Sequence, residues 1–204
     1  MTFATSHRHY PAAMAQLDSV GSTLLKAASD LLAAEGPAAL TVRGIATAAG
    51  VSTMNVYSRF GGKDGVVEHL FVEGFHRLGE AMGSRPLTDD PIADIRACGM
   101  AYRRFAVDNQ TLYSVMFDRV VPDFHPSVEA QVLAGATLDL LAKRLERAMS
   151  AGLLRSADPL HTAALVWATC HGVVSLELKQ VSPSAIDWSQ VYENATAMII
   201  KGLA

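Results

Sequence analysis

Apolar residues recur with the spacing of a helix along nearly the whole chain, and few segments show the alternation that is typical of strands. Beyond residue 64, prolines interrupt this pattern and are expected to separate the helices. The sequence therefore predicts an all-α fold. We expect a first helix that ends at Gly36-Pro37, a short helix that begins at Thr41, and later helices near residues 64–83, 91–108, 110–118, 127–150, 159–179 and 188–202.

Three aspartates stand where later helices are expected to begin. Asp90 and Asp158 are each followed by proline, which suits the first turn of a helix because no N–H is needed there. Asp187 precedes Gln190 by three residues, which resembles a capping box. The sequence thus predicts a helix start at each of these aspartates.

Charge is distributed unevenly along the chain, whose net charge is −3 at pH 7. Up to Lys63, five basic residues stand against three acidic ones, whereas the remainder carries twelve basic and seventeen acidic residues. A mildly basic segment is compatible with DNA contact, although this small excess does not decide the point. We predict a flexible arm over residues 1–16, a head over 17–63 and a larger body over 64–204.

The sequence lacks the features of a membrane or secreted protein. No apolar run reaches the roughly 18 residues of a membrane span, and the residues around His7, Arg8 and His9 do not resemble a secretion signal. Cys98 and Cys170 are far apart and lack the spacing of metal ligands, so core thiols are their simplest interpretation. We expect a cytoplasmic protein that does not contact a membrane.

Residues 41–60 carry the pattern of two short helices that cross at a tight turn. Ala46, Gly50 and Val56 stand where such a pair needs a small residue, a glycine with positive φ and an apolar residue. Ser52 is expected to cap the second helix. Spacing alone fits an ordinary helical hairpin equally well. Further apolar side chains are expected to complete a small core: Ile45, Ala49, Val51 and Phe60.

The polar side of the second short helix is the expected place for contact with DNA. The residues outside its buried stripe are Thr53, Asn55, Tyr57, Ser58 and Arg59. Side chains of these types can reach base edges in the major groove. A helical adaptor that binds only proteins, which is one alternative function, would leave this polar side without a purpose.

The run from Thr41 to Lys63, with its Ala-Gly-Val-Ser turn, Tyr57 and Phe60, strongly resembles the DNA-binding domain of the TetR (tetracycline repressor) family. The resemblance covers about residues 19–80. It implies a ligand-responsive transcriptional regulator, a repressor by family default, that binds a palindromic operator in double-stranded DNA as a homodimer. It also implies phosphate contacts for Thr41, Arg43, Tyr57 and Lys63, and base contacts for Thr53, Asn55 and either Ser58 or Arg59.

Gly44 departs from the family pattern, because relatives usually carry an acidic residue that completes the cap of the short helix. Glycine should cost this helix about 1 kcal/mol relative to alanine. We therefore expect the helix to be soft before it meets DNA.

The body carries two fragments that resemble the sensor subgroup named for its Trp-His-Gly pattern, namely residues 112–117 and the Trp167, His171 and Gly172 spacing. The segment 160–178 has almost no charge and is apolar around most of its circumference, so it must be buried on several sides. The family pairs its last two helices with those of a partner, which implies a dimer through residues 159–202. The expected interface residues are Val166, Val173 and Val174, and the alternative is a monomer that buries this helix internally.

Aromatic and sulfur side chains gather on the middle helices and suggest a cavity for a small, largely apolar effector. The expected lining is Tyr102, Phe105, Met116, Phe117, Trp167 and His171. Such a set also fits an ordinary core, and His171 fits a core histidine bonded to a backbone carbonyl.

An enzyme is the other alternative function, with little to support it. His69, Glu73 and His76 fall on one helix face and could hold a cation, but the spacing is not that of zinc hydrolases, and a solvated helix face explains them better. The sequence contains no glycine-rich phosphate loop, nucleophile elbow or paired catalytic carboxylates. We expect neither a cofactor nor a metal.

Overall fold

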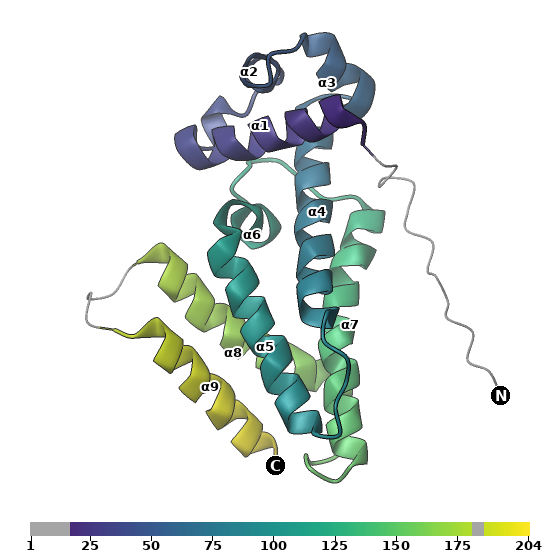
Figure 1. Ribbon diagram of the computed structural model, residues 1–204, viewed down its shortest axis with the longest axis vertical. Helices are drawn as coiled ribbons and strands as arrows, with labels where there is room; N and C mark the ends of the chain where they lie inside the picture. Colours follow the sequence, from purple (N-terminus) through teal and green to yellow (C-terminus); the bar gives the residue numbers. More distant parts are fainter. Residues whose placement is uncertain (1–16, 181–185) are drawn as a thin grey trace, which may run out of the picture.

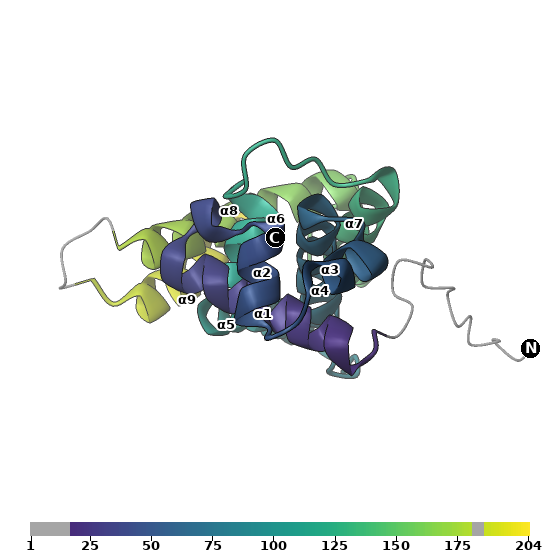
Figure 2. The same cartoon turned by 90° about the horizontal axis from the view of Figure 1, so that it is seen from above.

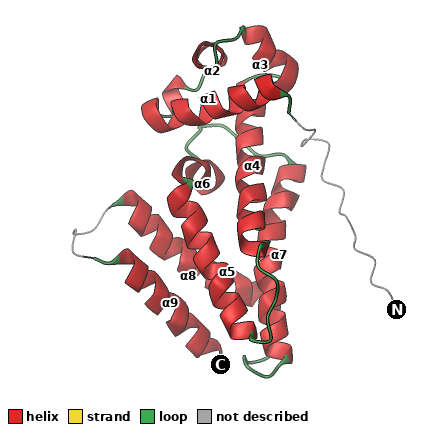
Figure 3. Cartoon of the chain, in the orientation of Figure 1, coloured by secondary structure: helices red, strands yellow, loops and turns green. Residues whose placement is uncertain are grey.

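The computed structural model describes residues 17–180 and 186–204, and within these ranges every regular element is helical (Figure 1; Figure 3). The predicted all-α class is confirmed. The arm predicted for residues 1–16 lies outside the described residues. The elements are α1 (Ser19–Glu35), a 3₁₀ turn η2 (Pro37–Ala39), α2 (Val42–Ala48), α3 (Thr53–Phe60), α4 (Lys63–Gly83), α5 (Pro91–Asp108), α6 (Gln110–Phe117), α7 (Val128–Ser150), α8 (Pro159–Lys179) and α9 (Trp188–Leu203).

The aspartates predicted to start helices do so. The Asp90 carboxylate accepts hydrogen bonds from two backbone N–H groups at the start of α5, and Asp158 accepts one from the N–H of His161 at the start of α8. Asp187 caps α9 by accepting from the backbone N–H of Gln190. The side chain of Gln190 bonds to Asn194 instead, so only half of the predicted capping box forms.

The head consists of α1, α2 and α3, which pack together over one end of α4 (Figure 2). Its core is made of fully buried side chains, including Leu24, Ile45 and Val56. Gly36, with φ of 78°, ends α1 where the sequence predicts, and Pro37 opens the 3₁₀ turn. Helix α4 continues from the head into the body and therefore belongs to both.

The body is a bundle in which α4 and α7 lie side by side and α8 and α9 form the opposite side (Figure 1). Helix α5 packs against α4, α7 and α8, and the short α6 lies between the body and α1. The buried apolar side chains of head and body form one continuous core. None of the described helices is long and apolar enough to cross a membrane.

Candidate DNA-binding head and effector cavity

The helices α2 and α3 form the helix-turn-helix that the spacing predicts. The Thr41 side chain caps α2 by accepting from the N–H of Gly44 at 3.0 Å. Gly50 has a φ of 68°, which favours glycine at the turn, and Ala46 and Val56 are buried where the two helices meet. The turn therefore holds α3 at a fixed angle to α2.

Gly44 has a packing reason that the sequence does not show. A methyl group on this residue would lie 2.7 Å from the carbonyl oxygen of Ala39. Glycine thus lets α2 approach the preceding 3₁₀ turn more closely than any other residue would. The loss of helix stability that we predict for glycine at this position would accompany this close approach.

Four side chains make up the outward side of α3: Thr53, Met54, Tyr57 and Ser58. Met54 is 69% exposed and Tyr57 54% exposed, whereas Val56 and Phe60 point into the head. Met54 was not predicted as a DNA contact, because its side chain has no polar group that would indicate one. An apolar group can contact the methyl group of thymine, so Met54 joins the candidates.

Asn55 and Arg59 are only partly exposed and bond to one another and to α1. The Asn55 amide donates to the Ser52 hydroxyl at 3.0 Å and accepts from Arg59 at 2.9 Å. Arg59 also donates to both carboxylate oxygens of Asp18, at 2.6 to 3.2 Å. Direct base contacts for Asn55 and Arg59 stay a prediction, but in the protein without DNA the polar atoms that would read a base are bonded within the head, which favours a positioning role.

This cluster also changes the expected cap of α3. Ser52 occupies the N-cap position, as predicted, but its hydroxyl accepts from Asn55 and makes no bond to a backbone N–H. Asp18 caps α1 through the N–H of Gly21 and simultaneously pairs with Arg59. The hydrogen bonds from Arg59 and then from the Gly21 backbone lower the pKa of Asp18 to about 2. The carboxylate therefore remains charged at neutral pH and links α1 to α3.

The candidate phosphate contacts lie around the outward side of α3. Thr41 and Arg43 are exposed at the start of α2, and Tyr57 projects from α3. Lys63 is half-buried and is the first residue of α4. These positions fit the phosphate contacts that the family resemblance implies.

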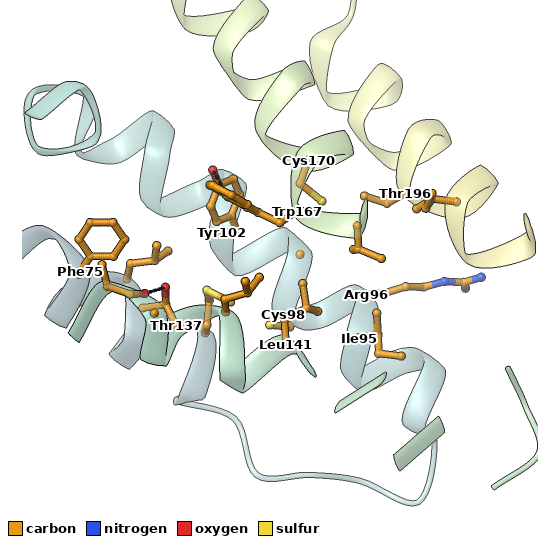
Figure 4. Close-up of a pocket in the computed structure, with 18 of the residues that line it drawn as sticks. Phe75, Ile95, Arg96, Cys98, Tyr102, Thr137, Leu141, Trp167, Cys170 and Thr196 are labelled. Carbon is orange, nitrogen blue, oxygen red and sulfur yellow. Dashed lines mark hydrogen bonds between the residues drawn. The ribbon is translucent and has the colours of Figure 1, made fainter. Parts of the chain in front are cut away.

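The body contains a cavity of about 250 Å³ between α4, α5, α7, α8 and α9, with the last residue of α6 at its wall (Figure 4). Its lining is mostly apolar, as is typical of small-molecule sites. Of the predicted residues, Tyr102, Phe117 and Trp167 line it. The sequence interpretation missed the contributions of α4, α7 and α9, among them Phe75, Leu138, Leu141 and Ile199.

Three predicted lining residues do not reach the cavity. Phe105 is buried elsewhere on α5, and Met116 packs against Gly74, where a methyl group would meet its sulfur at 2.5 Å. The His171 ring stacks on Tyr113, behind the lining. These three residues therefore do not line this cavity, and their assignment as effector contacts stays a prediction that the cavity does not support.

His171 belongs to a polar cluster that borders the cavity. Its Nδ1 lies 2.7 Å from the Tyr113 hydroxyl and 3.0 Å from the Tyr102 hydroxyl, and these hydroxyls are 2.9 Å apart. The Trp167 indole N–H donates to Tyr102 at 3.2 Å. Burial lowers the pKa of His171, so the neutral ring, with Nδ1 accepting from a tyrosine O–H, is favoured at neutral pH. The sequence analysis considered a backbone carbonyl as the partner of His171. The partners of Nδ1 are instead two tyrosine hydroxyls.

Exposed apolar side chains lie along the outward side of α8, and Met198 adds one on α9. Leu165 and Leu176 on α8 are 58% and 48% exposed, and Met198 on α9 is 73% exposed. Val166 and Val174 are almost fully buried inside the protomer, so their predicted place in a dimer interface is wrong. Val173 is partly buried against the same core. When a helix is apolar around its whole circumference, its sequence does not show which side packs against the core of the protomer.

The alternative metal site on α4 does not form. The ring nitrogen Nδ1 of His69 lies 2.8 Å from the carbonyl oxygen of Gly65, the Glu73 carboxylate accepts from Arg77, and His76 lies 3.8 Å from Glu80. Within residues 17–180 and 186–204, no group of three or more His, Cys, Asp or Glu side chains could hold a metal ion.

A helix-turn-helix head joined by a shared helix to a body with an apolar cavity defines a class of protein, the ligand-responsive DNA-binding regulators. The model for bacterial regulatory proteins of the tetR family matches residues 24–70. The model for the tetracyclin repressor-like C-terminal domain matches residues 95–199, more than half of the chain. The chain therefore belongs to the TetR family of transcriptional regulators, and it is not an enzyme.

Solved structures share this fold. A protein of unknown function from Rhodococcus sp. RHA1 is 24% identical, with a TM-score of 0.80 over 94% of this chain and 98% of its own. The TetR family regulator PfmR from Thermus thermophilus is 20% identical, with a TM-score of 0.69 over 89% and 98%. The fatty acid degradation regulator FadR from Bacillus halodurans is 18% identical, with a TM-score of 0.74 over 92% and 98%. No curated protein matches the chain.

Proposed function

We propose that this regulator is a cytoplasmic repressor, released from its operator by a small, largely apolar effector that binds the cavity of the body. The apolar cavity of about 250 Å³ carries this proposal, because it lies in the same continuous core as the helix-turn-helix. The similar FadR is named for fatty acid degradation, which also fits an apolar effector. We retain the division into a head over 17–63 and a body over 64–204.

The link between cavity and head would run through α6. Trp167 and Tyr102 line the cavity, and Tyr102 bonds to Tyr113 on α6. Helix α6 packs against both α4 and α1. An effector releases DNA only if it binds more tightly to the conformation in which the heads do not match the operator. A ligand that displaces Tyr102 would therefore act on α1 through two direct contacts, from Tyr102 to Tyr113 and from α6 to α1.

The proposal can be tested by mapping the sites that the protein occupies across its own genome. We expect a recurring palindromic sequence upstream of a small number of genes, because a two-fold dimer reads two half-sites. Raised transcription of those genes when the regulator is deleted supports repression. Lowered transcription would make it an activator, and occupancy without a recurring sequence would contradict operator recognition.

We propose that the dimer forms through the outward face of α8 and α9, with Leu165, Leu176 and Met198 as its apolar centre. These three side chains are each about half exposed or more in the protomer. Isologous pairing of this face about a two-fold axis along the length of the molecule would place both heads at the same end of the dimer, as a palindromic operator requires (Figure 1). Val173, at the edge of the same helix face, remains a candidate for the periphery.

In the head we propose base contacts from Thr53, Met54 and Ser58, and phosphate contacts from Thr41, Arg43, Tyr57 and Lys63. Asn55 and Arg59 then act as positioning residues that hold α3 against α1 through Asp18. The exposure of the first group and the hydrogen bonds of the second support this division.

Replacing Lys63 by alanine is expected to weaken binding to the operator and to a scrambled duplex equally. A lysine that neutralises one phosphate should contribute about one unit to the slope of log affinity against log salt concentration, so the variant should lose about one unit per half-site and about two for the dimer. A salt titration followed by fluorescence anisotropy measures both. Lys26→Ala is the matched control, because this exposed lysine pairs with Asp30 on α1. An unchanged slope in Lys63→Ala would remove Lys63 from the DNA contacts.

Replacing Asp18 by asparagine is expected to weaken binding to the operator while binding to a scrambled duplex changes little. Asparagine still caps α1, but it no longer holds Arg59 by charge, so α3 loses its ionic link to α1. The slope against salt should stay the same, because no phosphate contact is removed. If operator affinity stays at the value of the unmodified protein, the ion pair does not position α3 and the proposed role of Arg59 is wrong.

A further inference from the structure

The cavity of the body has chemically different ends. In Figure 4, Phe75 lies at one end of the drawn lining, and Arg96 and Thr196 lie at the other. Between them the lining is formed chiefly by apolar side chains of six helices, α4 to α9. Arg96 is the one charged side chain among the described residues that line the cavity. The apolar lining therefore has a single cation, at its exposed edge.

Arg96 differs from its neighbours in having no partner. Among the described residues, no hydrogen bond or ion pair engages its guanidinium, and the residue is exposed. By contrast, Arg103 on the same helix pairs with Glu177 at 2.6 Å, and Arg147 on α7 pairs with Asp94 at 2.6 Å. Arg96 is therefore an unpaired cation at the edge of the cavity.

The chemistry of these ends selects a ligand. The apolar lining between Phe75 and Arg96 favours a ligand with a hydrocarbon part, because burying apolar groups there removes them from water. A guanidinium binds a carboxylate with two parallel hydrogen bonds, a geometry that a neutral hydroxyl cannot match and an ammonium group opposes. Because Arg96 is exposed, its charge costs little to maintain before the ligand arrives.

We propose that the effector is an apolar carboxylic acid whose hydrocarbon part fills the cavity and whose free carboxylate binds Arg96. This inference rests on the proposed function, since it takes the cavity as the effector site. Arg96 is then the residue that determines specificity for the head group. Lengthening the hydrocarbon within the space available raises affinity, by about fourfold for each buried methylene.

The test compares decanoate, methyl decanoate, 1-decanol and decylammonium in a Trp188→Phe background, where Trp167 is the one remaining tryptophan. Quenching of Trp167 reports binding because its ring lines the cavity. Decanoate is expected to bind roughly tenfold more tightly than the alcohol or the ester, as a charge-assisted hydrogen bond would give. Decylammonium is expected to bind most weakly.

The same ligands are then tested on Arg96→Gln, Arg96→Lys and the control Arg104→Gln, an exposed arginine of α5 that does not line the cavity. Arg96→Gln is expected to lose the preference for decanoate while it keeps its affinity for the alcohol. Arg96→Lys should retain part of the preference, and Arg104→Gln should retain all of it.

The outcomes separate this inference from the proposed function. If the alcohol or ester binds as tightly as decanoate, or if Arg96→Gln keeps the preference, the carboxylate assignment is overturned although the cavity still binds ligands. If decanoate binds through Arg96 but does not release the operator, the inference stands and the proposed effector response is wrong. If no decyl compound quenches Trp167, both are contradicted.

Discussion

Replacing Gly65 by alanine is expected to abolish specific operator binding while the body remains folded and dimeric. Gly65 lies in the first turn of α4, where a methyl group would lie 1.7 Å from the carbonyl oxygen of Phe60, the last residue of α3. The neighbouring atoms belong to the backbone and cannot rotate away, so α3 and α4 must separate. We expect a loss of about 3 kcal/mol in the stability of the head, at the upper end for overpacking, and a misplaced α3.

Gly79→Ala is the matched control for this prediction. Gly79 lies on the same helix, and a methyl group there would meet Thr137 at an ordinary distance of 3.7 Å. Alanine should stabilise α4 at this position by up to about 1 kcal/mol. Thermal unfolding, light scattering and operator binding of the two variants are compared. Normal operator affinity in Gly65→Ala would show that the junction of α3 and α4 tolerates displacement, contrary to our account of the head.

Replacing Leu165 and Leu176 together by glutamate is expected to convert the dimer into folded monomers. Both side chains are exposed on α8 in the protomer, so their replacement should not disturb its core. In a two-fold dimer each substitution occurs in both protomers, so the interface would bury carboxylates that have no partner. This should raise the dissociation constant of the dimer roughly a hundredfold or more. Light scattering and sedimentation over micromolar concentrations measure this change. Operator affinity should fall with it, because the half-sites are then read separately.

Val132→Glu provides the control for the dimer surface. Val132 is 70% exposed but lies on α7, away from the proposed interface. It should leave the oligomeric state unchanged. A protein that is monomeric before any substitution, or a double variant that remains dimeric, would assign the apolar face of α8 and α9 to another role.

The helices were predictable from sequence because local chemistry determines where they begin and end. Asp90 and Asp158, each followed by proline, start α5 and α8, and Gly36 ends α1. These signals act over three or four residues, so no knowledge of the tertiary fold is needed. The small residue, glycine and apolar residue of the helix-turn-helix were predictable for the same reason.

The sites were predictable only in part because they depend on which side of each helix meets its neighbours. Asn55 and Arg59 lie outside the buried stripe of α3, yet Arg59 turns toward Asp18, which is 41 residues away in the chain, and Asn55 bonds to Arg59. Val166 and Val174 are apolar residues on a helix that is apolar all round, so their sequence cannot say whether they face core or partner. The cavity lining from α7 and α9 likewise depends on how these helices pack.

Operator binding in the presence of a cavity ligand tests the central claim most directly. A labelled operator duplex is titrated with the protein and followed by fluorescence anisotropy, then titrated with the ligand that quenches Trp167 most strongly. We predict saturation at two protomers per palindrome, weaker binding to a scrambled duplex, and release of the operator over the concentration range in which Trp167 is quenched. Equal binding to both duplexes, or an operator complex that persists when the cavity is saturated, would contradict the account.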